Sequence, residues 1–252
     1  MNATLPQEAV LREVTPAQLV RENARLRGDL ATIAGRISHD LRSPLGGIVN
    51  TGELLREMLI EKEPAAAALA DSLFASVDEM IKLIGQLRVI TQASAHPKTK
   101  ARVNLAELVA GVLQQLESRI LKTQATVVEP DSWPEVSAVP DWLQFIWWNL
   151  LANALQHAGE KPRIELNWRP EKDGYCFQVC DHGGGVPAEV RARLFQPFDS
   201  LHQPGSARGL GLSVVQRLVD LQGGHCGYEP NSKGGACFFF TLPAVGKDLD
   251  RK

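Results

Sequence analysis

The feature that most constrains this chain is a long helical repeat of apolar residues near its N-terminus. Apolar side chains recur there at steps of three and four: Leu26, Leu30, Ile33, Ile37, Leu41, Leu45 and Ile48. This spacing puts them on one face of a helix that packs into a bundle. His39 follows Ile37 by two positions, so at about 100° per residue it points away from this stripe, toward water. Pro44 cannot donate an N–H to the carbonyl of Asp40, so we expect the helix to bend or loosen there.

Two long helices account for the first part of the chain. The first is expected from about residue 15 to about residue 60, with Thr15 as N-cap and Pro16 at the first helical position. Residues 61–64 interrupt the pattern, and residues 65–93 repeat apolar residues at near-heptad spacing. The two form a helical hairpin with an uncovered apolar stripe, so two copies would make a dimeric four-helix bundle. The alternative is that the hairpin packs on the rest of its own chain.

Beyond a polar linker at 96–102, the pattern changes to mixed helices and strands. Helices are expected at 105–121, 142–157, with Asp141 as N-cap, and 210–221. Strands are expected at 125–128, 163–168, 175–180, 225–228 and 236–242, and a loop at 130–140. This order predicts an α+β sandwich with helices on one face of a sheet. The predicted fold has two domains, the hairpin at 15–95 and the sandwich at 103–244, with tails at 1–14 and 245–252.

Composition narrows the class of protein. Apolar residues make up 44% of the chain, enough for a packed core, and a net charge of −2 gives no reason to expect a nucleic-acid surface. No apolar run approaches the roughly 18 residues of a membrane span, and the N-terminus lacks a secretory signal, so we expect a cytoplasmic location. The cysteines lack zinc-site spacing, and we expect buried free thiols, not metal ligands or disulfides, at Cys176, Cys180, Cys226 and Cys237.

Polar and glycine residues in the second domain have the character of a nucleotide site. Asn149 and Asn153 are four residues apart on a predicted helix, and amide oxygens on one helix face can hold a hydrated Mg²⁺. Taken alone, such a pair is ordinary surface polarity. Asp181 ends a predicted strand, where its carboxylate can accept a hydrogen bond from an amine such as adenine N6. Gly183 and Gly185 would let the backbone approach a flat ring, although a tight turn explains them equally well.

A second pair of glycines opens the predicted helix at 210–221. In Gly209-Leu210-Gly211, the N–H groups at the helix N-terminus can bind phosphate, with a tight turn again the alternative. The chain contains neither the P-loop motif nor the G-x-G-x-x-G motif. Those two kinds of nucleotide site are therefore excluded.

Together these motifs resemble the catalytic core of the sensor histidine kinases of two-component systems. His-Asp-Leu-Arg-Ser-Pro-Leu at 39–45 is similar to the phosphoacceptor box of that family. The later motifs follow the order of the asparagine, first glycine, phenylalanine and second glycine boxes of the GHKL ATPases: Asn149 and Asn153; Asp181, Gly183 and Gly185; Leu194-Phe195-Gln196-Pro197-Phe198; Gly209 and Gly211. The resemblance covers about residues 15–243.

The resemblance implies an ATP-dependent kinase that phosphorylates itself on His39. Neutral imidazole would attack the γ-phosphorus, and Asp40 would accept the proton or hold the tautomer at the other ring nitrogen. Ser43, where many relatives have Thr or Asn, implies a phosphatase activity on the partner as well. The implied cofactors are ATP and Mg²⁺, with Asn149 and Asn153 also as metal ligands; the implied nucleotide residues are Asn149, Asn153, His157, Asp181, Gly183, Gly185, Arg208, Gly209, Leu210 and Gly211. The implied partners are a second copy and the receiver domain of a response regulator, which takes the phosphoryl group on an aspartate.

The chain also departs from the family pattern. Gln156 stands where many relatives carry a lysine or arginine near the phosphates, and Ala207-Arg208 replaces a common Gly-Thr pair. Arg208 either supplies the missing positive charge or is a solvated lid residue. Two alternatives therefore stay open: a phosphotransfer or scaffold protein with a weakened nucleotide site, and another GHKL ATPase. The second lacks support, because no Glu precedes Asn149 or Asn153 in the helix.

Overall fold

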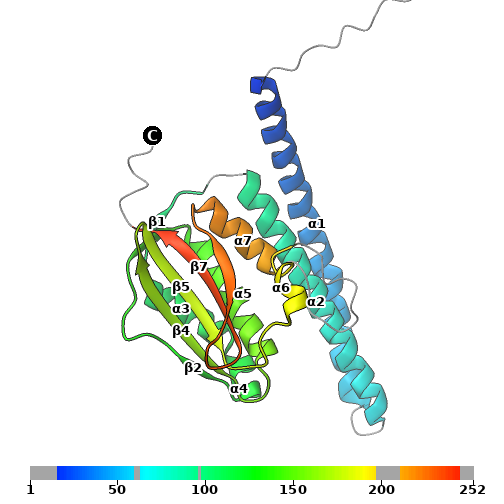
Figure 1. Cartoon of the computed structure of the whole chain (residues 1–252). Helices are drawn as coiled ribbons and strands as arrows, with labels where there is room; N and C mark the ends of the chain where they lie inside the picture. The colour runs from blue at the N-terminus through cyan, green and yellow to red at the C-terminus, as the bar shows by residue number, and fades with distance from the viewer. Residues whose placement is uncertain (1–15, 60–62, 96–97, 197–210, 245–252) are drawn as a thin grey trace, which may run out of the picture.

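A helical hairpin comes first in the computed structural model, which describes residues 16–59, 63–95, 98–196 and 211–244 (Figure 1). Helix α1 (Pro16–Leu59) runs antiparallel to α2 (Pro64–Ala95), so the predicted hairpin is confirmed. Helix α1 is continuous through Pro44, so the chain does not leave the helix there. The proposed N-cap, Thr15, lies outside the described residues.

The two helices of the hairpin meet through three small residues of α1 and one leucine. Ala31, Ala34, Ser38 and Leu45 are buried, and the Ser38 hydroxyl donates to the carbonyl of Ala34 at 2.6 Å. Most of the predicted stripe lies beside this contact instead of in it. Six of its members remain 42–57% exposed: Leu26, Leu30, Ile33, Ile37, Leu41 and Ile48. The periodicity thus identified an apolar face correctly, but within one chain that face is not covered by α2.

Helix α2 also packs on the second domain. Ala93 belongs to the main hydrophobic core, and Leu83, Val89 and Ile90 pack against it. Helix α2 contacts α7 (Gly211–Leu221), as Figure 1 shows. The alternative that the hairpin packs on its own chain is therefore correct for this face of α2, whereas the stripe of α1 stays open.

The second domain is a five-stranded sheet with helices on one face (Figure 1). Its strands are β2 (Thr126–Val128), β4 (Arg163–Glu171), β5 (Gly174–Asp181), β7 (Ala236–Pro243) and β6 (Cys226–Pro230), in that spatial order. Strand β2 is parallel to β4, and the other neighbours are antiparallel. Helices α3 (Leu105–Gln115), α5 (Pro140–His157) and α7 cover the sheet. The predicted α+β sandwich is confirmed.

The core of this domain forms around one tryptophan of α5. Trp147 is fully buried and meets Trp133, Phe177 and Phe240 edge-to-face, with ring centroids 5.3–6.1 Å apart. Aromatic rings favour this geometry because the positive edge of one ring faces the negative face of the next. The packing fixes α5 against β5 and β7, and α5 and β5 carry four of the ten candidate nucleotide residues.

Several expected boundaries are wrong. The helix predicted at 105–121 divides at Leu116, where ψ is near 1°, into α3 and α4 (Glu117–Thr123). The loop predicted at 130–140 contains β3 (Val136–Ala138), which pairs with β1 (Ala101–Val103) in a second sheet; β1 begins within the predicted linker. Asp141 is not the N-cap of α5, because the helix starts earlier with Pro140, and Val139 occupies that position.

The expectation of four free thiols is also wrong. Cys180 and Cys237 are directly opposite each other on β5 and β7 and form a disulfide, with Cα atoms 4.0 Å apart. Cys176 and Cys226 are free. The two bonded cysteines are 57 residues apart in sequence, so only the strand register brings them together.

Candidate functional site

The candidate phosphoacceptor is on the open surface of α1. The His39 side chain is 86% exposed, as its predicted position opposite the stripe required. Its Nδ1 lies 3.1 Å from Oδ1 of Asp40. When Nδ1 carries the proton and donates it to Asp40, Nε2 retains a lone pair that faces solvent. The arrangement can therefore present a nucleophilic nitrogen to a partner.

The surface beside His39 is hollowed and bears several polar side chains. A cavity of about 580 Å³ lies beside it, lined also by Arg36, Asp40, Gln92 and Lys98. These side chains come from α1, from α2 and from the segment that leads into the second domain. Ser43 is exposed one turn after His39 on the same side of α1.

On α5, the three predicted polar residues follow one helix face at intervals of four. Asn149 is buried, and its Nδ2 donates to the carbonyl of Phe145 at 2.9 Å. That bond turns the amide oxygen toward the start of α7, because a Cβ at Gly211 would lie 2.7 Å from Oδ1. Asn153 is half-buried, and His157, the last residue of the helix, is exposed.

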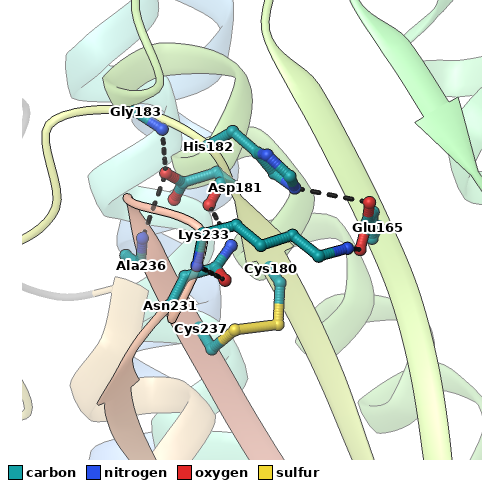
Figure 2. The surroundings of a disulfide bond; sticks show 9 residues. All are labelled: Glu165, Cys180, Asp181, His182, Gly183, Asn231, Lys233, Ala236 and Cys237. Carbon is teal, nitrogen blue, oxygen red and sulfur yellow. Dashed lines mark hydrogen bonds and ion pairs between the residues drawn. A yellow bond between two sulfur atoms is a disulfide. The ribbon is translucent and has the colours of Figure 1, made fainter.

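Asp181 is buried at the end of β5 and is held on two sides. Its Oδ1 accepts from the backbone N–H of Gly183 at 2.9 Å and of Ala236 at 3.2 Å (Figure 2). Its carbonyl accepts from Nδ2 of Asn231 at 2.8 Å. With both N–H groups on Oδ1, the second oxygen, Oδ2, is available to an amine of a ligand. This preorganised carboxylate is the kind of acceptor that adenine N6 requires.

Glycines let the parts of the site approach each other. A Cβ at Gly183 would lie 2.6 Å from the Cα of Ala158, so only glycine allows this loop to touch the end of α5. Gly185 has φ +71°, in the left-handed region. The structure therefore brings together α5, the loop after β5 and the start of α7. Arg208, Gly209 and Leu210 lie outside the described residues, as do Pro197 and Phe198 of the phenylalanine box.

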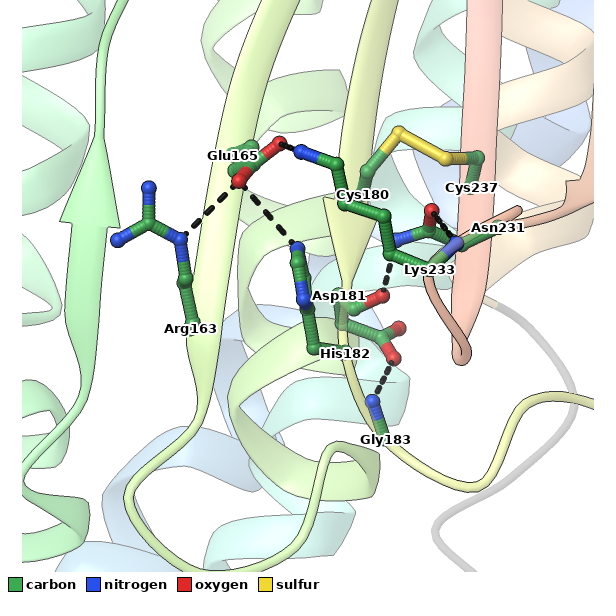
Figure 3. A network of polar contacts seen from close by, with 9 residues as sticks. All are labelled: Arg163, Glu165, Cys180, Asp181, His182, Gly183, Asn231, Lys233 and Cys237. Atoms are coloured by element: carbon green, nitrogen blue, oxygen red, sulfur yellow. Dashed lines mark hydrogen bonds and ion pairs between the residues drawn. A yellow bond between two sulfur atoms is a disulfide. The ribbon is translucent and has the colours of Figure 1, made fainter.

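A charged network next to Asp181 was not predicted. The Glu165 side chain, 19% exposed, accepts from Nε of Arg163 at 3.0 Å and lies 3.5 Å from Nζ of Lys233 and 3.4 Å from Nε2 of His182 (Figure 3). The hydrogen bond from Arg163, supported by the charges of Lys233, His182 and Arg163, lowers the pKa of Glu165 although burial acts in the opposite direction. Because His182 follows Asp181 directly, the network braces the start of the loop that follows the carboxylate.

Two further contacts near the site were also not predicted from the sequence. Asn231, from the turn between β6 and β7, secures Asp181, and the amide of Gln86 on α2 lies 3.5 Å from the Cβ position of Gly211. Both residues are far in sequence from the residues they meet. The only local signal was the Asn-Ser-Lys-Gly-Gly turn sequence at 231–235.

Both halves of the chain match known families. Residues 29–95 match the His Kinase A (phospho-acceptor) domain, and residues 138–246 match the histidine kinase-, DNA gyrase B-, and HSP90-like ATPase family. The chain belongs to the sensor histidine kinases. It contains the core of that family, a dimerisation and phosphotransfer domain followed by an ATP-binding GHKL domain.

Individual relatives agree with this assignment. The methanogenesis regulatory histidine kinase FilI of Methanothrix harundinacea is 28% identical over 93% of this kinase core, which spans only 28% of FilI. The crystal structure of full-length ShkA in complex with AMPPNP matches 84% of this chain and 45% of ShkA, at 25% identity and a TM-score of 0.63. The crystal structure of ThkA in complex with the response regulator TrrA shares the fold, with a TM-score of 0.59 and 22% identity. The match covers 92% of this chain and 68% of the ThkA chain. None of the helices within the described residues of the kinase core is long and apolar enough to span a membrane.

Proposed function

We propose that this kinase core transfers the γ-phosphoryl group of ATP to His39 and then to an aspartate of a response regulator. One observation carries the proposal: a single chain combines an exposed histidine–aspartate pair with a buried, doubly held carboxylate at a GHKL nucleotide site. The boundaries that we assign are 15–95 for the phosphoacceptor domain and 103–244 for the ATP-binding domain. The whole protein's activity and partners are part of this proposal, because the chain spans less than a third of FilI, at 28%.

The nucleotide would lie between α5, the loop after β5 and the start of α7. Oδ2 of Asp181 accepts from adenine N6, and Gly183 and Gly185 let the ring approach the backbone. Asn149 and Asn153 fit Mg²⁺, because the bond from Nδ2 of Asn149 leaves its amide oxygen facing α7. The bound metal would spread the negative charge of the triphosphate. The remaining residues that we assign to phosphate and lid contacts are His157, Arg208, Gly209, Leu210 and Gly211.

The transfer forms one bond and breaks one. Nε2 of His39 attacks the γ-phosphorus, the bond to the β–γ bridging oxygen breaks, and ADP leaves. Asp40 accepts the hydrogen bond from Nδ1 throughout and stabilises the positive charge that develops on the ring. The exposure of His39 supports this assignment, since the same nitrogen must meet first a nucleotide and then a regulator.

The partners follow from the surfaces of α1. We assign the cavity beside His39 to the docking of a receiver domain, and Ser43, one turn further, to the positioning of a hydrolytic water in a phosphatase reaction. The ThkA–TrrA complex offers a precedent in a protein of the same fold. The uncovered stripe of α1 supports a homodimer that closes a four-helix bundle. We place the kinase core in the cytoplasm, where response regulators receive phosphoryl groups.

The decisive test is phosphorylation with γ-labelled ATP and Mg²⁺ on wild type and His39→Gln. We expect an acid-labile, alkali-stable label on wild type that falls to background in the variant, while both bind ATP with the same Kd. Retained labelling of His39→Gln would remove His39 from the mechanism. ATP binding without any label on wild type would instead favour a chain that acts mainly as a phosphatase, and no ATP binding would favour the scaffold alternative.

A further inference from the structure

A row of four residues crosses the sheet on the face opposite its helices. Glu165 on β4 pairs with Cys180 on β5, Cys180 with Cys237 on β7, and Cys237 with Glu229 on β6. Alternate residues of a strand point to opposite faces, and the neighbours Val179 and Phe238 belong to the core beneath the helices, so this row faces away from them. The disulfide thus lies outside the main core, beside the network of Glu165 (Figures 2 and 3).

On both strands, the disulfide is next in sequence to a residue of the hydrogen bond between Ala236 and Asp181. Cys180 directly precedes Asp181, and Cys237 directly follows Ala236, whose N–H donates to Oδ1 of Asp181 at 3.2 Å. The covalent bond and this hydrogen bond therefore span the same gap between β5 and β7, one residue apart. A change in the spacing of the strands at the disulfide must alter the position of the carboxylate.

The other two cysteines are unsuited to this chemistry. Burial raises the pKa of the Cys176 thiol to about 11 and that of the Cys226 thiol to about 12, so both stay protonated at neutral pH. Cys180 and Cys237 are also buried, at 6% and 8% exposed, and differ from these two in lying directly opposite each other on neighbouring strands. Cys176 shares the outward face of β5 with Cys180, whereas Cys226 packs against the core on the other face. The sheet separates them, so only Cys180 and Cys237 are placed to pair.

We propose that Cys180 and Cys237 are a redox-sensitive modification site that adjusts the affinity of the kinase core for ATP; this rests on the nucleotide site and location proposed above. Disulfides are rare in the cytoplasm because dithiol proteins and glutathione keep thiols reduced, so a disulfide there responds to oxidants. In reduction, a thiolate of a dithiol attacks one sulfur and forms a mixed disulfide. The second thiolate of the dithiol then attacks the mixed disulfide, which leaves the protein with two thiols and the reductant as an internal disulfide. In the opposite direction, glutathione disulfide oxidises the two protein thiols to the Cys180–Cys237 disulfide and is itself converted to two glutathione thiols.

We expect reduction to weaken the hydrogen bond from the Ala236 N–H to the Asp181 carboxylate. Two sulfur atoms that are no longer bonded cannot stay as close as bonded ones, so β5 and β7 must separate locally. Their Cα atoms are 4.0 Å apart at this pair, which is closer than the roughly 4.5–5.5 Å of ordinary antiparallel partners. Separation lengthens the bond from Ala236 to Asp181. The oxidised form is therefore the form with the preorganised carboxylate and the higher affinity.

The test compares ATP affinity of the whole chain in two redox states. The protein is equilibrated with glutathione disulfide or with dithiothreitol, free thiols are counted by mass labelling, and Kd for ATP with Mg²⁺ is measured by calorimetry. Of the four cysteines, two should be free after oxidation and all four after reduction. Reduction should raise Kd about fivefold, the equivalent of one weakened hydrogen bond.

Variants separate this site from general effects of oxidation. Cys180→Ala with Cys237→Ala removes the disulfide and should abolish the redox response, so that its Kd for ATP is the same under both conditions. The matched control, Cys176→Ala with Cys226→Ala, should retain the full redox response. The comparison of oxidised with reduced wild type uses no variant, so it remains valid even if one of the double variants fails to fold.

Two results would overturn the inference alone: equal Kd values with the disulfide verified, or four free thiols after treatment with glutathione disulfide. A complete absence of ATP binding in both states would overturn the nucleotide site itself, and the redox inference with it. Binding and thiol counts are read separately from phosphorylation, so these outcomes cannot be confused with a failure of His39.

Discussion

The sandwich fully buries several of its large apolar side chains, whereas in the hairpin most large apolar side chains of α1 face outward. Trp147, Phe177 and Phe240 are inaccessible to solvent, but Leu55 and Leu73 of the hairpin are 51% and 48% exposed. Burial of apolar surface is the main favourable term in folding, so the sandwich has a complete core in one chain. The hairpin reaches comparable burial only when another surface covers it. We therefore expect dimerisation and nucleotide binding to be separable properties of this molecule.

The two residues that we propose for phosphoacceptance and adenine binding follow the same contrast. The His39 side chain is 86% exposed, whereas Asp181 is 4% exposed and held by two backbone N–H groups. A phosphoacceptor must be reached by two different partners, so it has to remain on the surface. A carboxylate that selects adenine is useful only when its position is fixed before the ligand arrives.

The largest effect should come from polar substitutions in the open face of the hairpin. Leu55 and Leu73 line an apolar groove of about 610 Å³ between α1 and α2. Leu55→Asp with Leu73→Asp would place two carboxylates in the bundle core, and we expect the dimer Kd to rise by at least about 100-fold. Analytical ultracentrifugation measures the change. Leu121→Asp is the control, because Leu121 is 70% exposed on α4, away from the hairpin. An unchanged dimer Kd would show that the exposed apolar face of the hairpin is not the dimer interface.

The second effect should appear in nucleotide binding alone. Asp181→Asn removes a charged acceptor and turns an amide N–H₂ toward either the backbone donors or the ligand. The loss of a charge-assisted hydrogen bond should raise Kd for ATP about 50-fold. Calorimetry on Asp220→Asn, an exposed residue of α7, gives the baseline. The dimer should be unaffected, and a loss of both properties together would show that the domains are not independent.

A smaller effect separates two neighbouring glycines. A Cβ at Gly183 would meet the backbone of Ala158 at 2.6 Å, whereas a Cβ at Gly184 has no heavy atom within 4 Å. Gly183→Ala must push the loop away from α5 and should cost ~1–2 kcal/mol, which is about tenfold in Kd for ATP. Gly184→Ala should bind ATP as wild type does. Equal affinities for the two variants would show that the loop does not need its close approach to α5.

Local patterns predicted the hairpin, the exposure of His39 and the end of β5 at Asp181, because each depends on residues close in sequence. The same patterns could not predict which face of α1 meets α2, since small residues such as Ala31 and Ala34 carry little periodic signal. Pairings between distant strands were missed as well. Cys180 with Cys237, and β1 with β3, depend on register, which the alternation of one strand does not contain. The residues that hold the site were therefore harder to predict than those that form it.

The smallest effect concerns the network that braces the loop after β5. The pKa of Glu165 is lowered in the folded protein, chiefly by the hydrogen bond from Arg163, so its carboxylate stabilises the fold at any pH above its unfolded pKa of about 4.3. This stability is lost as the pH falls through the lower, folded value. Glu165→Gln should lower the free energy of unfolding by ~0.5–1 kcal/mol at neutral pH, and the difference should shrink in acid. Urea unfolding at neutral pH and at about pH 3.5 measures it, with the exposed Glu160→Gln as control. A difference that stayed constant with pH would mean that Glu165 acts through packing and not through its charge.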